Sequence, residues 1–450
     1  MSSAQELALG KQAHQQTLQQ YRTYNDAALA QYVDSVGQRL AAQSHRADLQ
    51  YTFTVLDSDE INAFALPAGY IYITRGLLAY LNSEAELAAV LGHEIGHVTA
   101  RHGVRQASSA QAANIGSGML AVFFPQLRST GMSQSIGLLS KAMLSGYGRE
   151  HELEADRLGA SYIGATGYDS GAMFDVIRVL KNQELFDRKL ARAEGREPRA
   201  YHGLFSTHPD NDTRLKEIIA ETPANSRGER HRERFLNHLD GLIFGNNPNE
   251  GVIVENRFIH PSLGVAFDIP AGWQSQNQSE QLILADPNRK AVMLVRLAKT
   301  KAGLAPTEVI KKLGIGPLSQ VEAFKPGGRR GVRALAQVDI EGTRRPARVA
   351  AVISGDYGYV FVGFTVDGQA LGSYDSAFSA VSASFRGLSA AEKAAVKPQV
   401  LAVTRIKNSI SWATLAKVSP LKKLAEARLA LLNGSDAAGA AAGSRIKVVK

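Results

Sequence analysis

The chain has 450 residues, of which 44% are hydrophobic and 21% charged, and it contains no cysteine. This composition excludes a disordered chain, disulfide bonds and thiolate zinc sites, and the length allows two or three domains. No run of about 18 apolar residues indicates a membrane-spanning helix, and the start MSSAQELALGKQ lacks the pattern of a signal peptide.

The net charge of +9 is spread unevenly along the chain. Residues 287–450 carry 26 basic and 10 acidic side chains, whereas residues 1–286 carry 25 basic and 32 acidic ones. The basic half favours an anionic partner, such as a cell-wall glycan or an anionic membrane surface, although solubility would explain it equally well. No aromatic-rich basic motif indicates nucleic acid, so we expect no nucleic-acid partner.

The first half of the chain is expected to be mainly helical. Apolar residues at three-to-four spacing predict helices over residues 4–45, whereas 51–58 and 69–75 (GYIYITR) have the pattern of strands. Ser83 and Glu86 match a capping box, so a helix is expected from there to about Arg101. Further helices are predicted at 149–165, 171–194 and 211–221, the last after a loop that ends near Pro209.

The second half is expected to be rich in strands. Residues 222–256 are polar and rich in Asn and Pro, which indicates a linker. Alternating strands follow, interrupted by helices near 306–313 and 368–384, and they predict a mostly antiparallel domain. The fold class is therefore α+β, with a mainly helical domain over 1–245, an α/β domain over 246–390 and a small unit over 391–450.

The sequence HEIGH, residues 93–97, predicts a metal site. On a helix, His93 and His97 lie on one face about 5–6 Å apart, so that both imidazoles can bind one Zn²⁺. Glu94 is displaced by about 100° and can act as a general base toward the attacking water. The alternative is a helix that merely exposes these polar residues.

A catalytic zinc needs a third protein ligand, which must be His, Asp or Glu in a chain without cysteine. The stretch REHELEAD, residues 149–156, is the best source, because Glu152 and Asp156 share a helix face. Glu152 is assigned as the ligand and Asp156 as a carboxylate that orients a ligand histidine. By spacing alone, Glu150, His151 and Glu154 remain alternatives, and so does a solvated charged helix face.

HEIGH, the later E-x-x-x-D helix and NAFALPAGYIYITRGLL together resemble the HtpX/CAAX-prenyl-protease family of zinc metallopeptidases over residues 5–220. The soluble BepA-type subgroup, of gluzincin type, is the most similar. The resemblance implies one Zn²⁺ per chain, with Glu152 as the third ligand. It also implies supporting roles for Asp156, Asn62 and Arg214.

The resemblance also implies how substrate and zinc access are controlled. An edge strand at Gly69, Tyr70, Ile71, Tyr72 and Ile73 would bind an extended polypeptide by strand addition. His208, in STHPDNDTRL, would occupy the open zinc position and keep the enzyme latent. Alternatively, His208 donates to the oxyanion or is an ordinary loop residue.

Two weaker resemblances concern the rest of the chain. FIHPSLGVAFDIPAGW, residues 258–273, resembles the opening of PsbP/Mog-like domains, and the tail resembles LysM-type glycan-binding modules but lacks their G-D-T. We expect a zinc endopeptidase of the periplasm or cell envelope that acts on misfolded or misassembled proteins, a location that is compatible with the earlier removal of a signal peptide. The alternative is a non-proteolytic chaperone or cell-wall binding protein with a closed structural zinc site.

Overall fold

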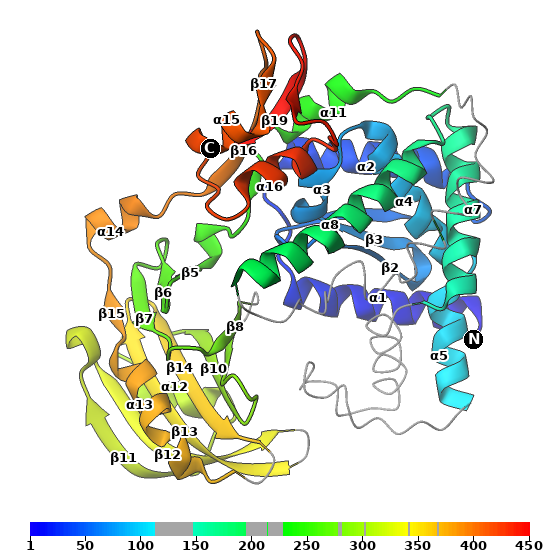
Figure 1. The fold of residues 1–450 in the computed structure, drawn as a ribbon. Helices are drawn as coiled ribbons and strands as arrows, with labels where there is room; N and C mark the ends of the chain where they lie inside the picture. Colours follow the sequence, from blue (N-terminus) through cyan, green and yellow to red (C-terminus); the bar gives the residue numbers. More distant parts are fainter. Residues whose placement is uncertain are drawn as a thin grey trace. The chain divides into compact units, whose positions relative to one another are not determined.

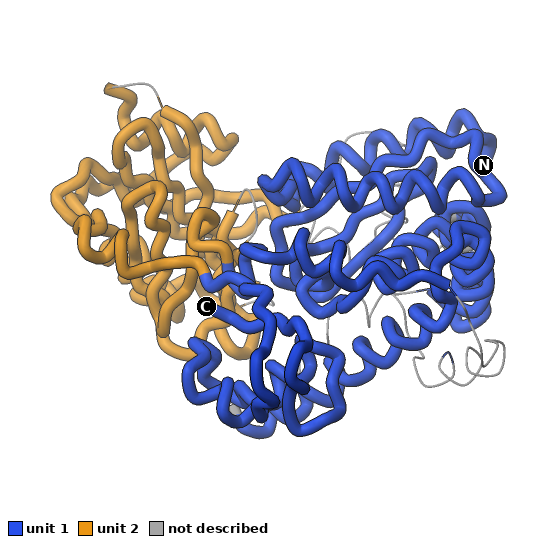
Figure 2. The backbone as a smooth tube through the Cα atoms, turned by 90° about the horizontal axis from the view of Figure 1, so that it is seen from above, with its two compact units in different colours: residues 1–246, 399–450 blue, residues 247–398 orange. Residues whose placement is uncertain are grey.

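The computed structural model describes residues 1–112, 147–194, 214, 228–277, 281–300, 303–340, 343–366 and 369–450. These residues form two compact units: unit 1 comprises Met1–Asn246 and Gln399–Lys450, and unit 2 comprises Asn247–Pro398 (Figure 2). The chain therefore leaves unit 1 once and returns to it at its C-terminal end. Among the described helices, none combines the length and apolar character needed to cross a bilayer.

Unit 1 consists of helices around a small three-stranded sheet (Figure 1). Its elements up to the linker are α1 (Ser3–Gln20), α2 (Ala27–Ala41), β1 (Thr52–Leu56), β2 (Ala63–Leu66), η1 (Pro67–Gly69), β3 (Tyr70–Thr74), α3 (Arg75–Tyr80), α4 (Glu84–Thr99), α5 (His102–Ala112), α7 (Arg149–Ala165), α8 (Ala172–Glu194), α11 (Arg232–Leu239) and β4 (Ile243–Phe244). The C-terminal segment adds β16 (Gln399–Arg405), β17 (Ile410–Ser411), α15 (Trp412–Val418), α16 (Ala425–Leu432), β18 (Gly439–Ala440) and β19 (Arg445–Val449). Each predicted helix and strand in the described part of unit 1 is confirmed, apart from small differences at its ends.

The three-stranded sheet lies between two layers of helix. β3 is the central strand, parallel to β1 and antiparallel to β2. On one face, Leu66 and Tyr72 pack against Leu9 of α1. On the other face, Ile71 and Ile73 join the large core formed with α2 and α4. This alternation follows from the period of two along a strand.

The prediction that residues 69–75 form an edge strand is wrong. β3 is paired on both sides, because Tyr72 lies opposite Thr54 of β1 and Phe64 of β2. Ala68 (φ 67°) and Gly69 (φ 91°) have left-handed backbone conformations, so the chain turns sharply at η1 and β2 folds back on β3. The backbone groups of Tyr70–Ile73 are therefore already used within the sheet, and the predicted substrate-binding role of Gly69, Tyr70, Ile71, Tyr72 and Ile73 loses its structural basis.

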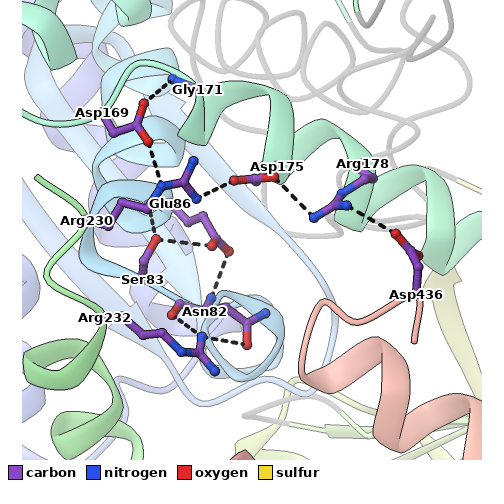
Figure 3. Close-up of polar contacts among 10 residues, drawn as sticks. All are labelled: Asn82, Ser83, Glu86, Asp169, Gly171, Asp175, Arg178, Arg230, Arg232 and Asp436. Atoms are coloured by element: carbon purple, nitrogen blue, oxygen red, sulfur yellow. Dashed lines mark hydrogen bonds and ion pairs between the residues drawn. The ribbon is translucent and has the colours of Figure 1, made fainter. Parts of the chain in front are cut away.

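Helix α4 is enclosed by the rest of unit 1. Every residue from Glu84 to Val98 is buried, as expected for a helix with apolar residues on all sides. The predicted start is confirmed: the Ser83 hydroxyl accepts from the Glu86 N–H at 3.2 Å, and the Glu86 carboxylate accepts from the Asn82 N–H at 2.8 Å (Figure 3). These caps hold the helix on which HEIGH lies.

The C-terminal segment Gln399–Lys450 shares the hydrophobic core of unit 1. Trp412, Leu429, Leu432 and Ile446 are buried in the same cluster as the side chains of α2, α4 and α8. β16, which follows unit 2 in the sequence, also pairs with β4, which precedes unit 2. The segment is therefore a structural part of unit 1 (Figure 2).

Lys447 ties this segment to the turn that precedes α4. Its side chain is fully buried, and its ammonium donates to the carbonyl oxygens of Ala79 at 2.7 Å and Leu81 at 2.6 Å. Burial lowers the pKa of Lys447 well below its ordinary value, while the nearby Glu86 carboxylate acts in the opposite direction. Two carbonyls at the end of α3 thus depend on a side chain from the last strand.

Unit 2 is a mostly antiparallel structure, as predicted for this part of the chain. Its seven-stranded sheet has the order β11-β12-β13-β14-β10-β9-β8, and a four-stranded sheet has the order β15-β7-β6-β5. One core lies on each face of the larger sheet. Its elements are η2 (Pro248–Glu250), β5 (Val252–Val254), β6 (Arg257–His260), β7 (Val265–Asp268), β8 (Gln274–Asn277), β9 (Gln281–Ala285), β10 (Ala291–Lys299), α12 (Pro306–Lys312), β11 (Leu318–Phe324), η3 (Pro326–Gly328), β12 (Gly331–Ile340), β13 (Thr343–Ser354), β14 (Tyr357–Thr365), η4 (Leu371–Ser373), α13 (Asp375–Ala383), β15 (Arg386–Gly387) and α14 (Ala390–Ala395).

The whole chain is thus a mixed α/β protein with several antiparallel sheets. The expected separate unit over residues 391–450 is not observed, because residues 399–450 belong to unit 1 and residues 247–398 form unit 2. The LysM-like character of the C-terminal segment stays a prediction.

Glu60, in the loop after β1, gives a pH dependence to the stability of unit 1. Burial, together with the adjacent Asp59 charge, raises the pKa of Glu60 from 4.5 to about 7. Because the folded pKa lies above the unfolded one, the carboxyl favours folding below pH 4.5, and this contribution is lost as the pH rises through 7. We expect Glu60→Gln to be nearly neutral at pH 4.5 and stabilising by up to about 3 kcal/mol at pH 8.

Urea unfolding of both proteins across this pH range measures the difference. The exposed Glu255 provides the control, since Glu255→Gln should leave stability within about 0.5 kcal/mol at every pH. A difference between wild type and Glu60→Gln that does not change with pH would contradict this role of the carboxyl.

Candidate metal centre

The site is formed where α4 and α7 pack at very short distance. A Cβ atom at Gly96 would lie 2.8 Å from the carbonyl oxygen of Ala155, and one at Gly159 would lie 2.9 Å from the His93 nitrogen. Both distances are shorter than real side-chain contacts, so only glycine allows this approach. The glycine within HEIGH therefore brings the first two turns of α7 against the two histidines.

His93, His97 and Glu152 come together at this crossing. The Nε2 atoms of His93 and His97 are 3.0 Å apart, and they lie 3.5 Å and 3.4 Å from the two Glu152 carboxylate oxygens. All three side chains are buried, and in the described part of the chain they form the one His/Asp/Glu group able to surround a metal ion.

The spacing of these donors fits a zinc ion. Ligand atoms placed tetrahedrally at about 2.0–2.1 Å from zinc would be about 3.3–3.4 Å from one another. The three observed separations, 3.0, 3.4 and 3.5 Å, lie around that value. Two imidazoles and a carboxylate are also a donor set found in catalytic zinc sites, where three protein ligands leave one position open.

Asp156, one turn after Glu152 on α7, orients His93. Its Oδ1 atom accepts from the His93 Nδ1–H at 2.7 Å, which leaves Nε2 as the electron-pair donor toward the metal position. Arg214 holds Asp156 through its Nε and Nη2 atoms, both at 2.7 Å, and its Nη1 lies 3.2 Å from Glu152. Asp156 thus makes the contact expected of a carboxylate that orients a ligand histidine, and the roles of Asp156 and Arg214 in the site stay predictions.

The charges of this group stabilise one another in the interior. Burial would raise the pKa of Asp156, but the Arg214 guanidinium and His93 hold that pKa well below its usual range. Burial would lower the pKa of His93, yet the Asp156 charge and the hydrogen bonds that His93 donates to Asp156 and Glu152 raise it to about 9. The Asp156 and Arg214 charges are thus balanced by direct contacts, and His93 would release its Nε2 proton on binding a metal.

His97 has a supporting partner that the sequence analysis missed. Its Nδ1 atom lies 2.8 Å from Nδ1 of His102, whose Nε2 lies 3.0 Å from the Glu154 carboxylate. Burial lowers the pKa of His102 to about 4 despite Glu154, so His102 is neutral near pH 7 and accepts the His97 Nδ1–H. Glu154, one of the alternatives left open for the metal, therefore lies on the outer side of the site.

The chain bends sharply between His97 and His102. α4 ends at Thr99, and Arg101 adopts a left-handed backbone with φ 58° before α5 begins at His102. The ring of Tyr147 also stacks on His97, with 4.1 Å between ring centroids. A third histidine nine residues after the first was the available sequence signal for His102, but its use depends on this turn.

We expect His102→Leu to weaken zinc binding by about 10–100-fold, because His97 loses the partner that fixes its ring and tautomer. His102→Gln keeps an acceptor at this position and should recover part of the affinity. Competition titration with a chromophoric zinc chelator measures both. Equal affinities of wild type and His102→Leu would show that His102 does not support the site.

The other predicted site residues make fewer described contacts with His93, His97 and Glu152. Glu94 is buried on α4 directly after His93. Asn62 is also buried, but its backbone is bound to Thr74 and its Oδ1 has no hydrogen-bond partner among the described residues. His208 lies outside the described residues, and so does the predicted helix at 211–221 apart from Arg214.

An H-E-x-x-H helix whose two histidines lie beside a glutamate from a later helix is the arrangement typical of zinc metallopeptidases. In agreement, residues 27–222 match the family described as Peptidase family M48. This segment, somewhat less than half of the chain, is thus similar to peptidase family M48, which agrees with the family resemblance and the metallopeptidase class inferred from the motifs.

Several relatives share this segment. The "Beta-barrel assembly-enhancing protease" of Escherichia coli (strain K12) is 31% identical over 222 residues, which cover 48% of this chain and 43% of the relative. The "Putative beta-barrel assembly-enhancing protease" of Vibrio cholerae is 35% identical over 156 residues, covering 33% and 32%. The "Mitochondrial metalloendopeptidase OMA1" of Schizosaccharomyces pombe is 30% identical over 189 residues, covering 42% and 51%. The chain thus spans about half or less of the length of these relatives.

Among solved structures, cyanobacterial PsbP (CyanoP) from Synechocystis matches with 15% identity and a TM-score of 0.25, over 30% of this chain and 95% of that one. The PsbP/Mog-like character of unit 2 stays a prediction.

Proposed function

We propose that this chain is a zinc-dependent endopeptidase, with His93, His97 and Glu152 as the metal ligands and Glu94 as the general base. The observation that carries the proposal is the meeting of the two histidines and Glu152 within 4.8 Å, one residue away from a buried glutamate. When bound, zinc would supply Lewis-acid chemistry, polarising the scissile carbonyl and making a water acidic near neutral pH.

Glu94 would move the proton during hydrolysis. Its carboxylate would take a proton from the attacking water and then give that proton to the amine that leaves when the peptide bond breaks. Because the water supplies the oxygen, the reaction needs no covalent intermediate with the protein. Burial of Glu94, which is 1% exposed, keeps bulk water from competing for that proton.

The surrounding side chains would keep the ligands in position. Asp156 and Arg214 fix the ring of His93, while His102 and Glu154 fix the ring of His97. Each ligand imidazole thereby keeps its Nε2 atom directed at the metal position, which saves the cost of ordering it during binding.

The substrate strand would pair with β2 rather than with β3. In the described part of the chain β2 pairs only with β3, so one of its edges has unpaired backbone groups. A small cavity of about 10 Å³ lies between the end of β2 and the site and is lined by Ala65, Leu66, Pro67 and His97, among others. An extended polypeptide added to this edge would run beside the metal ligands.

The relatives favour polypeptides of the cell envelope as substrates. Two of them are named for assisting β-barrel assembly, which indicates action on proteins that fail to assemble. We therefore propose a periplasmic or envelope location and a role in protein quality control. His208 as a latch on the open zinc position is also part of the proposal, and activation by His208→Ala would support it.

Removal and return of the metal tests the proposed activity. We expect a zinc chelator to reduce cleavage of an unfolded protein such as casein by at least about 100-fold, and about one equivalent of Zn²⁺ per chain to restore it. Peptide release followed by mass spectrometry gives the rate. Cleavage that continues unchanged in the chelated protein would contradict a metallopeptidase mechanism.

A further inference from the structure

Unit 1 contains a second cavity that shares no residue with the metal group. Its volume is about 150 Å³, and its walls come from α3, α8, β4, α16 and the loop after β1. Gln183, Phe186, Asp187 and Leu190 of α8 all face it, since they are spaced by three and four residues along one helix face. A cavity of about this volume is large enough to hold a small molecule such as benzene, and this one has charged and polar as well as apolar walls.

Hydrogen-bond donors without partners face this cavity. Gln183 is 2% exposed, and its Nε2 atom makes no hydrogen bond with the described part of the chain. The Nε atom of Arg428 is likewise buried without a hydrogen-bond partner among the described residues, and the guanidinium stacks over the Phe186 ring at 5.0 Å. A buried donor that lacks an acceptor costs about 1–3 kcal/mol, so a ligand that supplies one would relieve that cost.

The hydroxyl of Tyr80 lies near the same two donors. Burial raises the pKa of Tyr80, while the Arg428 charge and a side-chain interaction with the Gln183 amide act in the opposite direction, so a ligand would compete with the Tyr80 hydroxyl for Gln183. Arg75, by contrast, is already occupied, because it donates to Asp57 at 2.6 Å and to the Ile243 carbonyl at 3.1 Å. The donors that remain for a ligand are therefore those around Arg428 and Gln183, which suit a carboxylate.

Negative and apolar groups complete the lining. Asp59 and Asp187 would repel a ligand that carries only a negative charge, whereas a ligand ammonium would be attracted to them. Ile61, Leu190 and Phe244 provide an apolar wall for a hydrocarbon group. A molecule that matches the donors, the two aspartates and the apolar wall has a carboxylate, an ammonium and a short apolar side chain.

We propose that this cavity binds a small zwitterion with an apolar side chain, that is, a free aliphatic amino acid, with its carboxylate at Arg428 and Gln183. The site is independent of the proposed peptidase activity. The alternative is a cavity filled by ordered water, which two to four polar partners per molecule would also allow.

Three probes that differ by one group each test the proposal on the wild-type chain. Leucine carries both charges, 4-methylpentanoate lacks the ammonium, and 3-methylbutylamine lacks the carboxylate. Saturation-transfer NMR titration up to about 10 mM should show saturable binding of leucine, and at least about tenfold weaker binding of both analogues. No binding of leucine, which is the result for a water-filled cavity, or equal binding of all three probes would overturn the proposal.

Two variants locate the binding. Arg428→Met and Gln183→Leu should each weaken leucine binding by about tenfold or more, whereas Arg330→Met, at an exposed arginine of unit 2, should not. If Gln183→Leu fails to fold, the Arg428→Met variant, at a partly exposed residue, and the comparison of the three probes still test the proposal. Leucine affinity unchanged in Arg428→Met would place the ligand elsewhere, for example on the metal, and would overturn the assignment.

Discussion

Glu94→Gln is expected to lower the rate of peptide cleavage by about 10²–10⁴-fold, the usual contribution of a positioned acid–base group. Glutamine has nearly the same size and shape as glutamate but cannot take a proton from water or return it to the leaving amine. Because His93, His97 and Glu152 are untouched, zinc content and thermal stability should stay close to those of wild type. The measurement is initial-rate cleavage of casein, with metal content determined on the same samples.

Glu150→Gln is the matched control for this prediction. Glu150 is an exposed glutamate on the first turn of α7, two residues before the proposed ligand Glu152, so the same chemical change is made beside the site. The control should cleave at a rate within about twofold of wild type. If Glu94→Gln cleaves as fast as Glu150→Gln, Glu94 is not the general base.

Deletion of residues 399–450 is expected to abolish the cooperative folding of unit 1. Trp412, Leu429, Leu432 and Ile446 are buried in its core, and each contributes about 1.5–3 kcal/mol by burial. Together these contributions are comparable to the total stability of about 5–15 kcal/mol that is typical of a folded domain. The truncated chain should therefore show no sharp thermal transition from unit 1 by calorimetry, and no metal-dependent cleavage.

A single substitution in the same segment tests its contribution to the stability of unit 1. Lys447→Met keeps the volume of the side chain but leaves the carbonyls of Ala79 and Leu81 without their donor, so we expect a loss of about 2 kcal/mol in urea unfolding. Lys450→Met, at an exposed lysine three residues later, should change stability by less than about 0.5 kcal/mol.

The outcome that would contradict the deletion prediction is a chain lacking residues 399–450 that melts sharply and cleaves like wild type. That result would show that the segment is an independent module.

The helices of the metal centre could be predicted because their signals are local. The cap at Ser83, the H-E-x-x-H spacing and the i, i+4 relation of Glu152 to Asp156 each depend on a single helix, and the structure confirms these helices. That Glu152 rather than Glu150 or Glu154 faces the histidines followed from the family resemblance, because spacing alone does not give the rotation of α7. Gly96 and Gly159 set that packing, and they act only once the two helices meet.

The features that sequence reasoning missed depend on partners far apart in the chain. β3 has the alternating pattern of any strand, so nothing local shows that both of its edges are occupied. His102 acts through His97 and Glu154, which a left-handed turn at Arg101 and a separate helix bring together. Likewise, a lysine in the final strand has no local signal that it is buried against α3.

The central claim is that His93, His97 and Glu152 hold one catalytic zinc. Diffraction from zinc-loaded crystals on the two sides of the zinc absorption edge tests it most directly. We predict a single anomalous peak about 2.0–2.2 Å from the Nε2 atoms of both histidines and from a Glu152 carboxylate oxygen, absent in a Glu152→Ala crystal. A peak away from these three side chains, or a peak of full height in Glu152→Ala, would contradict the claim.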